Sequence, residues 1–380
     1  MIRIVFIIFF QFAFVGTVLA QLDNSLFEDR KVLHPERSSR VYLGVDFLGF
    51  TRNNEYFNQI ADGYTLFGYQ FSPHLTYYPA ENVRVDAGIF LHKDFGISDY
   101  YTVAPTFSVK IKRDKMQFVF GNLDGSLNHR LIEPLYDFER VMNDRLETGI
   151  QAIWNTDKTF LDLWINWETM IYPGDNKQEE VSGGFSLDYL LSASENFEVR
   201  LPVQTVLYHK GGQIDVSPAP LVSFMNNALG LSVRIPVSEA GFLRAFRTDN
   251  YYVHFLDFSF EKVQPYTSGS GIYLNLTAEF KNIDFMTSYW RGDEFISIKG
   301  AALYQSVSNS FKNPGYTEDQ RELLIFRLMH NIKILDNLHL SSRFEPFYDL
   351  GNSKFEFSHG LYLNYRPDFY LFNVKEASYD

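Results

Sequence analysis

The chain has 380 residues, of which 46% are hydrophobic and 17% aromatic, and its formal net charge is −12. This composition excludes a disordered chain, because disordered segments lack the apolar surface that folding buries. The absence of cysteine excludes disulfides, thiolate metal sites and a thiol nucleophile. The acidic balance offers no basic surface for phosphates, so nucleic acid is not an expected partner.

Residues 1–20 have the pattern of a secretory signal peptide. Arg3 precedes an apolar stretch, and Val18 and Ala20 stand where a small-residue cleavage site requires them. A membrane anchor is the alternative, but the apolar stretch is short, is interrupted by a glutamine and is followed by polar residues. We therefore expect an exported protein that is cleaved after Ala20.

Beyond the signal peptide, apolar residues alternate with polar ones instead of forming runs long enough for a membrane helix. In residues 159–171, Leu161, Leu163 and Ile165 alternate with Asp162 and Asn166. The same period of two recurs near residues 67–77, 83–92, 102–111, 185–191, 272–280 and 356–366. Strands of this length exceed the five or six residues usual in soluble sheets and suit a bilayer crossing of about nine to eleven.

Short and long connections alternate between these segments. Seven short polar turns separate eight longer loops, which we place at residues 50–63, 93–99, 123–146, 172–179, 209–220, 262–270, 291–320 and 349–354. The count predicts an all-β fold, a transmembrane antiparallel up-and-down barrel of about 16 strands. Residues 242–262 are long for one strand and residues 295–306 alternate within a loop, so 14 or 18 strands remain open.

The predicted domain organisation is a signal peptide at 1–20 and one barrel domain at 21–380. Residues 21–40 and 367–380 are expected to lie outside the barrel as periplasmic segments, with Phe27, Val32 and Leu33 packing into the barrel mouth or against a partner. Aromatic residues at strand ends are expected to form the interfacial girdles, among them Tyr77, Tyr78, Trp154, Trp167 and Tyr289. A soluble periplasmic sandwich or propeller is the alternative, although no blade-length repeat supports a propeller.

At the level of architecture the chain resembles Gram-negative outer-membrane β-barrel proteins, particularly the aromatic-rich barrels of Bacteroidota-type bacteria. The export signal, the alternating strands and the short and long turns carry this resemblance. It implies a cell outer-membrane location with outer-membrane lipid as the surroundings. It leaves open whether the barrel stands alone, forms a homo-oligomer or joins accessory outer-membrane or periplasmic proteins.

The inward faces of the expected strands carry both signs of charge: Arg84, Asp86, Lys110, Asp162, Glu168, Asp188, Arg200, Glu279, Arg327, Arg343, Glu345 and Arg366. A barrel of this width with a charged wall holds water, as wide porins do. We therefore predict a porin-like channel for passive transport of small hydrophilic solutes or ions. The alternative is that these charges only pair with one another across the wall.

The connection at 123–146 is the predicted constriction. In general porins the loop after the fifth strand folds into the lumen, and this loop resembles that element in position, length and charge. Its charged candidates are Arg130, Glu133, Asp137, Glu139 and Arg140, while Leu131, Tyr136 and Phe138 are expected to pack on the wall. The alternative is an outward loop that packs on neighbouring loops or on a partner chain.

The sequence contains no fixed-spacing motif that would indicate an enzyme. The sequence contains no GxSxG, HExxH or Walker loop, and His92, Asp94, His129 and His209 only stand near expected loop starts. Asp162 and Glu168 are six residues apart on one strand, about 20 Å, which is too far for paired carboxylate chemistry. We therefore expect no enzymatic activity, no catalytic residue, no metal and no cofactor, with an accessory barrel or a rim-active hydrolase as the alternatives.

Overall fold

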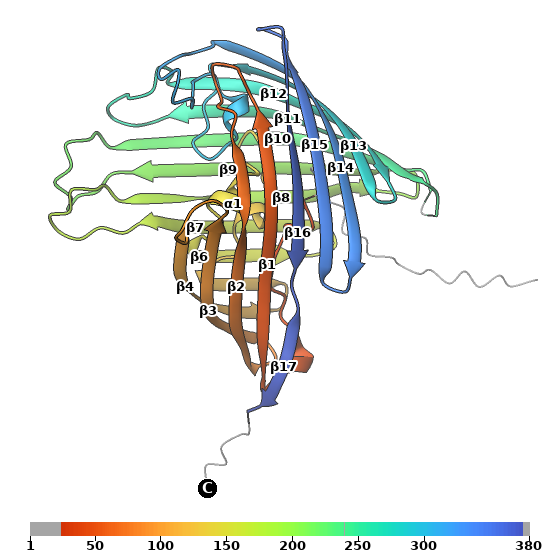
Figure 1. Ribbon diagram of the computed structural model, residues 1–380. Helices are drawn as coiled ribbons and strands as arrows, with labels where there is room; N and C mark the ends of the chain where they lie inside the picture. The colour runs from red at the N-terminus through yellow and green to blue at the C-terminus, as the bar shows by residue number, and fades with distance from the viewer. Residues whose placement is uncertain (1–23, 239, 375–380) are drawn as a thin grey trace, which may run out of the picture.

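The computed structural model describes residues 24–238 and 240–374, and the predicted signal peptide lies outside the described residues. The chain forms a closed antiparallel β-barrel (Figure 1). β1 (Arg40–Glu55) pairs with β2 (Thr65–Ala80) on one side and with β16 (Lys354–Tyr365) and β17 (Asp368–Asn373) on the other. Because β16 and β17 lie end to end along β1, they act as one interrupted strand, and the predicted 16-stranded barrel is confirmed.

The intervening strands each pair with their neighbours in sequence. They are β3 (Val83–Asp94), β4 (Thr102–Arg113), β5 (Met116–Asn122), β6 (Thr148–Asn155), β7 (Thr159–Thr169), β8 (Glu180–Ala193), β9 (Glu198–Lys210), β10 (Val222–Pro236), β11 (Leu243–Asp257), β12 (Ser268–Phe280), β13 (Ile283–Asp293), β14 (Gln320–Leu335) and β15 (Leu338–Asp349). The long stretch at 242–262 therefore contains one strand, and residues 295–306 lie in a loop.

Helices are minor elements of the described chain. They are the 3-10 turns η1 (Pro35–Arg37), η2 (Ser126–His129) and η3 (Ala302–Tyr304) and the single-turn α1 (Arg140–Asn143), which Figure 1 shows among the strands. Within residues 24–238 and 240–374, no helix is long and apolar enough to cross a membrane.

The side-chain alternation along the strands separates two environments. On β7 the outward Leu163, Ile165 and Trp167 are 45%, 52% and 46% exposed, whereas the inward Asp162 is fully buried. The inward and outward sets predicted for this strand are confirmed. Tyr78, expected in an interfacial girdle, is an exception because it is fully buried and points inside, where the guanidinium of Arg84 donates to its hydroxyl at 3.2 Å.

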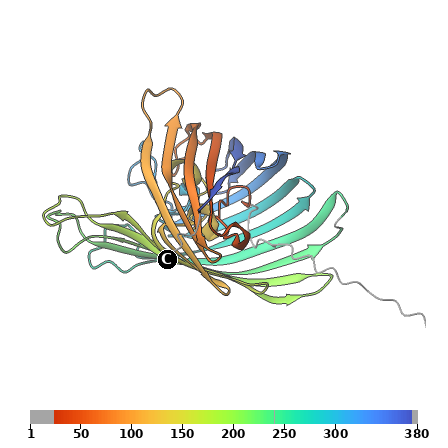
Figure 2. The same cartoon turned by 90° about the horizontal axis from the view of Figure 1, so that it is seen from below.

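Three segments fill the interior that the strands enclose in Figure 2. They are an N-terminal segment (residues 24–38), an inner loop between β5 and β6 (residues 123–147) and loop 294–319. Phe27 is 2% exposed, and its ring packs edge-on against Phe138 of the inner loop and Tyr362 of β16, with ring centroids 5.0 and 5.1 Å apart. Three segments that are far apart in the sequence therefore occupy the wide lumen.

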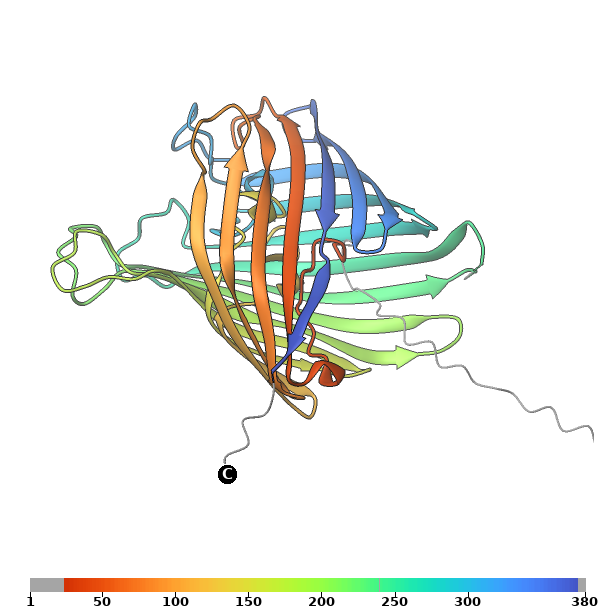
Figure 3. The same cartoon turned by 60° about the horizontal axis from the view of Figure 1, so that its bottom comes forward.

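The ends of the barrel domain differ from the expectation that both lie outside the barrel, although Phe27 and Leu33 do pack into it as one of the two expected arrangements had them. The described part of residues 21–40 lies mostly inside the barrel, beside β17 in Figure 3, because Phe27 and Leu33 bury their side chains there. At the other end, residues 368–373 form β17 and pair with β1 from Arg40 to Gly44. This pairing satisfies backbone groups that would otherwise leave β1 with an open edge. Val32, which is 57% exposed, does not share the burial of its neighbours.

The packing of Phe27 predicts that Phe27→Ala lowers the free energy of unfolding by about 3 kcal/mol, since it opens a cavity between two rings. Chemical denaturation in detergent micelles measures this loss. Val32→Ala is the matched control, because it truncates an exposed side chain of the same segment. Equal stability of the two variants would mean that the packing of Phe27 contributes nothing to the stability of the folded barrel.

Candidate functional site

The inner loop lies inside the barrel, and main-chain hydrogen bonds hold it there. The amide of Ile132 donates to Gln204 Oε1 on β9 at 2.9 Å, and the amide of Asp137 donates to the carbonyl of Lys299 in loop 294–319 at 2.8 Å. Its apolar residues Leu131, Ile132, Leu135 and Tyr136 join one buried cluster with inward residues of the wall. This is the inward fold that these apolar residues predicted, rather than a loop directed outward.

The half of the lumen that is nearest to the long loops holds a network of arginines and carboxylates. Arg52 on β1 donates to Glu139 at 2.8 Å and to Glu345 at 2.7 Å. Arg327 on β14 donates to Glu345 at 3.2 Å and also pairs with Glu133 of the inner loop. Sequence reasoning missed Arg52, because residues 50–63 were assigned to a loop although β1 continues to Glu55.

A cavity of about 430 Å³ lies against this network, and we call it the outer cavity. Its lining comes from strand wall, inner loop and loop 294–319, and it includes the predicted site residues Glu133, Asp137, Glu139, Arg140 and Glu345. Burial, with the neighbouring Glu139 carboxylate, raises the pKa of Asp137 to about 7. The cavity therefore contains a carboxyl group that changes charge near neutral pH.

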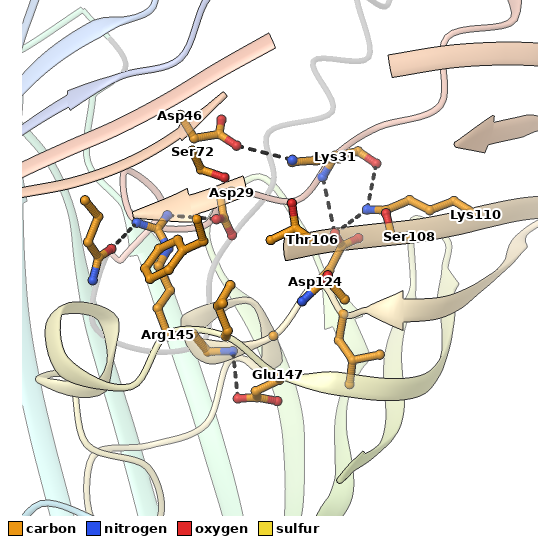
Figure 4. A pocket seen from close by; sticks show the side chains of 17 residues that line it. Asp29, Lys31, Asp46, Ser72, Thr106, Ser108, Lys110, Asp124, Arg145 and Glu147 are labelled. Atoms are coloured by element: carbon orange, nitrogen blue, oxygen red, sulfur yellow. Dashed lines mark hydrogen bonds and ion pairs between the residues drawn. The ribbon is translucent and has the colours of Figure 1, made fainter. Parts of the chain in front are cut away.

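The half of the lumen that is nearest to the short turns holds a second network. It surrounds a smaller cavity of about 90 Å³, which Figure 4 shows. Lys31 of the N-terminal segment pairs with Asp46 at 3.2 Å, and Lys110 pairs with Asp124 and donates to the carbonyl of Lys31. Asp29 accepts from Arg145 at 2.7 Å. Burial opposes ionisation of Asp29, but Arg145 and Arg366 outweigh it and hold its pKa well below the usual range.

His129 of the inner loop lies in a buried cluster of its own. Its Nδ1 is 2.9 Å from Asp162 Oδ2, its Nε2 is 2.8 Å from Glu147 Oε2, and its ring stacks on Trp164 at 3.8 Å. Burial alone would lower the pKa of His129, but the two carboxylates outweigh it and raise the pKa to about 9. At neutral pH the imidazolium donates from both nitrogens, so His129 ties the loop to the wall and has no free nitrogen to serve as a base.

The remaining predicted site residues also form ion pairs or hydrogen bonds inside the barrel. The pairs are Arg84 with Asp86, Glu168 with Lys299, Arg200 with Asp188 and Glu198, Arg130 with Glu28, and Arg140 with Asp144, while Arg343 donates to Asn24. The structure thus brings these charges together in pairs, as the alternative reading of the charged wall described.

On the outer surface of the barrel, His209 and Ser223 face each other. They are directly opposed on β9 and β10, with His209 Nδ1 2.8 Å from Ser223 Oγ. Both point away from the lumen, because their neighbours along the strands, among them Phe224, point inward. Ser223 is only 7% exposed, and its amide donates to Ser259 Oγ at 2.7 Å in the adjacent loop. An imidazole bonded to a hydroxyl is the arrangement that activates a serine nucleophile.

Two further histidines lie at the same end of the barrel. His254 on β11, Ser270 on β12 and Asp293 on β13 are opposed in register and line an outer groove of about 390 Å³. His92, expected near a rim, is 4% exposed and its Nε2 lies 3.0 Å from Asp94 Oδ1. In the described part of the chain, no three histidine or acidic side chains are grouped so that they could hold a metal ion.

The sequence signal for the serine was absent for a physical reason. Ser223 follows His209 by 14 residues, and only the register of two antiparallel strands brings them together. A motif search reads spacing along one segment and cannot detect a pair formed across strands. His209 was recognised as a rim residue, but its partner could not be named.

The pKa of His129 predicts a pH-dependent contribution to stability. The folded-state pKa of about 9 lies above the ordinary value of 6.5, so the contribution is complete below about pH 6.5 and disappears as the pH rises through about 9. His129→Gln should cost roughly 3 kcal/mol at about pH 6 and much less at about pH 10. Denaturation in micelles at both pH values measures this, with the more exposed His34→Gln as control, and a pH-independent loss would contradict the assignment.

Solved structures with the same fold are outer-membrane barrels. OpdL from Pseudomonas aeruginosa matches with a TM-score of 0.51 and 13% identity over 86% of this chain and 99% of that chain. OprD from the same organism, named an outer membrane protein, matches with 0.51 and 12% over 90% and 98%. OccAB4 from Acinetobacter baumannii matches with 0.50 and 9% over 88% and 100%. At these identities the similarity shows the fold, and the chain is an outer-membrane β-barrel.

Among curated proteins, none matches the sequence. A family model described as Lipid A 3'-O-deacylase-type matches residues 33–374. Because that description denotes an enzyme, the expectation of no enzymatic activity is wrong. The error came from requiring a motif with fixed spacing along the sequence. The chain belongs to the Lipid A 3'-O-deacylase-type family.

Proposed function

We propose that the protein is an outer-membrane hydrolase that cleaves an ester-linked acyl chain from a lipid of the outer leaflet. The observation that carries this proposal is the 2.8 Å contact between His209 Nδ1 and Ser223 Oγ on the outward face of β9 and β10. The family description supports the substrate class, with the acyl ester at the 3' oxygen of lipid A as the first candidate.

The surroundings of the pair suit a lipid substrate. Leu207 and Trp167 on the same outer face are 42% and 46% exposed, and Phe258 beside Ser223 is 53% exposed. Exposed apolar and aromatic side chains at the loop end of a barrel lie where acyl chains meet headgroups. An acyl ester at that depth would reach Ser223 without entering the lumen.

The chemistry follows from the two side chains. His209 accepts the proton of Ser223 while the serine oxygen attacks the acyl carbonyl, forming a tetrahedral intermediate. Collapse of the intermediate breaks the ester bond, and the imidazolium returns the proton to the sugar oxygen that leaves. Water, activated by the same imidazole, then hydrolyses the acyl-serine and releases a fatty acid.

Ser223→Ala and His209→Gln should each lower hydrolysis by roughly a thousandfold or more, because each removes half of the activated nucleophile. Mass spectrometry of fatty acid released from purified lipopolysaccharide by the reconstituted protein measures the rate. The matched controls are Ser270→Ala and His254→Gln, an outward serine and histidine on the neighbouring strands. Loss of activity in these controls but not in the first two variants would move the site to the outer groove.

A second candidate function is passive passage of small hydrophilic solutes or ions through the lumen. The outer cavity of about 430 Å³ and its position beside the inner loop favour it. In this proposal Glu133, Glu139 and Arg140 of the inner loop set the width of the passage opposite Arg52 and Arg327. Hydrolysis on the outer face and passage through the interior use opposite faces of the wall, so one does not exclude the other.

Deletion of residues 126–143 should raise single-channel conductance in planar bilayers, because it removes the part of the inner loop that crosses the lumen. Deletion of residues 96–99 at the tip of the β3–β4 loop is the control and should leave conductance unchanged. Heat-modifiable migration on gels verifies that both variants are folded barrels. A folded deletion variant with the conductance of the parent protein would remove the constriction proposal.

A further inference from the structure

We propose that the outer cavity binds a small organic cation that carries several hydrogen-bond donors. The cavity measures about 430 Å³, within the size range of ligand pockets. It lies inside the barrel, away from the outward Ser223 and His209. The proposal therefore concerns a separate site from that of the proposed hydrolysis.

The first observation is the charge balance of the lining. The basic residues that line the cavity already have acidic partners: Arg52 with Glu139 and Glu345, Arg327 with Glu133 and Glu345, Lys299 with Glu168, and Arg140 with Asp144. Among the described residues, Asp137 has no such cationic partner in an ion pair. Its recorded side-chain contact is the amide of Glu139, which donates to Oδ1 at 2.9 Å. The cavity thus presents a carboxyl group that no basic side chain of the described residues holds in an ion pair.

The second observation is an unpaired amide oxygen in the same lining. Asn54 is 3% exposed, and its Nδ2 donates to Glu139 at 2.6 Å, which fixes the orientation of the amide. Its Oδ1 is buried without a donor from the described residues. A buried acceptor left unpaired is costly, so a ligand that donates to it gains affinity.

These two groups determine the chemistry of the ligand. A carboxylate and an amide oxygen both require donors, which an ammonium or guanidinium group supplies together with the missing positive charge. Arg140 Nε is a buried donor without an acceptor among the described residues, and it suits a ligand that also bears a carboxylate. The partly exposed ring of Tyr56 in the lining, which packs against the buried Phe347 with ring centroids 5.3 Å apart, offers aromatic surface to the cation.

The pH dependence of binding follows from the groups that face Asp137. Burial and the carboxylates of Glu139 and Glu133 raise its pKa to about 7, while the amide of Glu139 and the guanidinium of Arg52 oppose that rise. The hydroxyl of Tyr64 faces the same carboxylates and donates to Glu139. Asp137 is therefore anionic above about pH 7 and neutral below it, so cation binding should strengthen as the pH rises through 7.

Isothermal titration of the detergent-solubilised, full-length mature protein with L-arginine tests the proposal. We expect saturable binding at about pH 8, roughly tenfold weaker at about pH 5.5, and at least tenfold weaker binding of L-citrulline, which replaces the guanidinium with a neutral urea. Asp137→Asn should weaken L-arginine binding to the level of L-citrulline. Asp336→Asn, which changes a carboxylate on an exposed turn, should not.

Absence of L-arginine binding at both pH values, or equal binding by parent protein and Asp137→Asn, would overturn the proposal. A folded Asn54→Leu variant provides a second test, because it removes the amide acceptor without changing charge and should also weaken binding. The titration uses no lipid substrate and no membrane potential. Its outcome is therefore independent of whether hydrolysis or solute passage is observed.

Discussion

Closure of the sheet at β1 is the constraint on which the rest of the structure depends. β1 pairs with β2 along one edge and with β16 and β17 along the other, so the barrel has no open edge. In a bilayer every backbone donor and acceptor must be satisfied within the protein, and closure achieves this. Closure also divides every strand into a face toward lipid and a face toward the lumen, which determines where each polar side chain can lie.

The polar interior then has to be filled and neutralised. A barrel of this width leaves space that wall side chains cannot fill, and the N-terminal segment, the inner loop and loop 294–319 occupy it. Several of their contacts with the wall are ion pairs between one charged residue of a segment and one of a strand, as in Glu133 with Arg327 or Lys31 with Asp46. A buried ion pair adds little net stability, but removing one of its members leaves an uncompensated buried charge, which is costly. Each pair therefore acts mainly by fixing the position of a segment against the wall.

Sequence reasoning reached the features that depend on local periodicity. Alternation along residues 159–171 located β7 and its two faces, and the apolar residues of the inner loop indicated an inward fold. It failed where contacts join distant parts of the chain. β17 follows Pro367 and became recognisable only through its pairing with β1, and Arg52 was placed in a loop because β1 is longer than its pattern suggested.

The same alternation explains how one wall can serve two chemistries. On β10, Ser223 points outward to His209, whereas Asn226 points inward and donates to the carbonyl of Ile296 at 2.6 Å, holding loop 294–319 beside the outer cavity. Odd- and even-numbered residues of this strand point to opposite faces of the sheet, one toward lipid and one toward the lumen. Their side chains therefore make no contact with each other across the sheet. The proposed hydrolytic pair in the lipid-facing layer and the proposed binding cavity in the lumen therefore constrain different residues, so that a substitution at one site need not disturb the other.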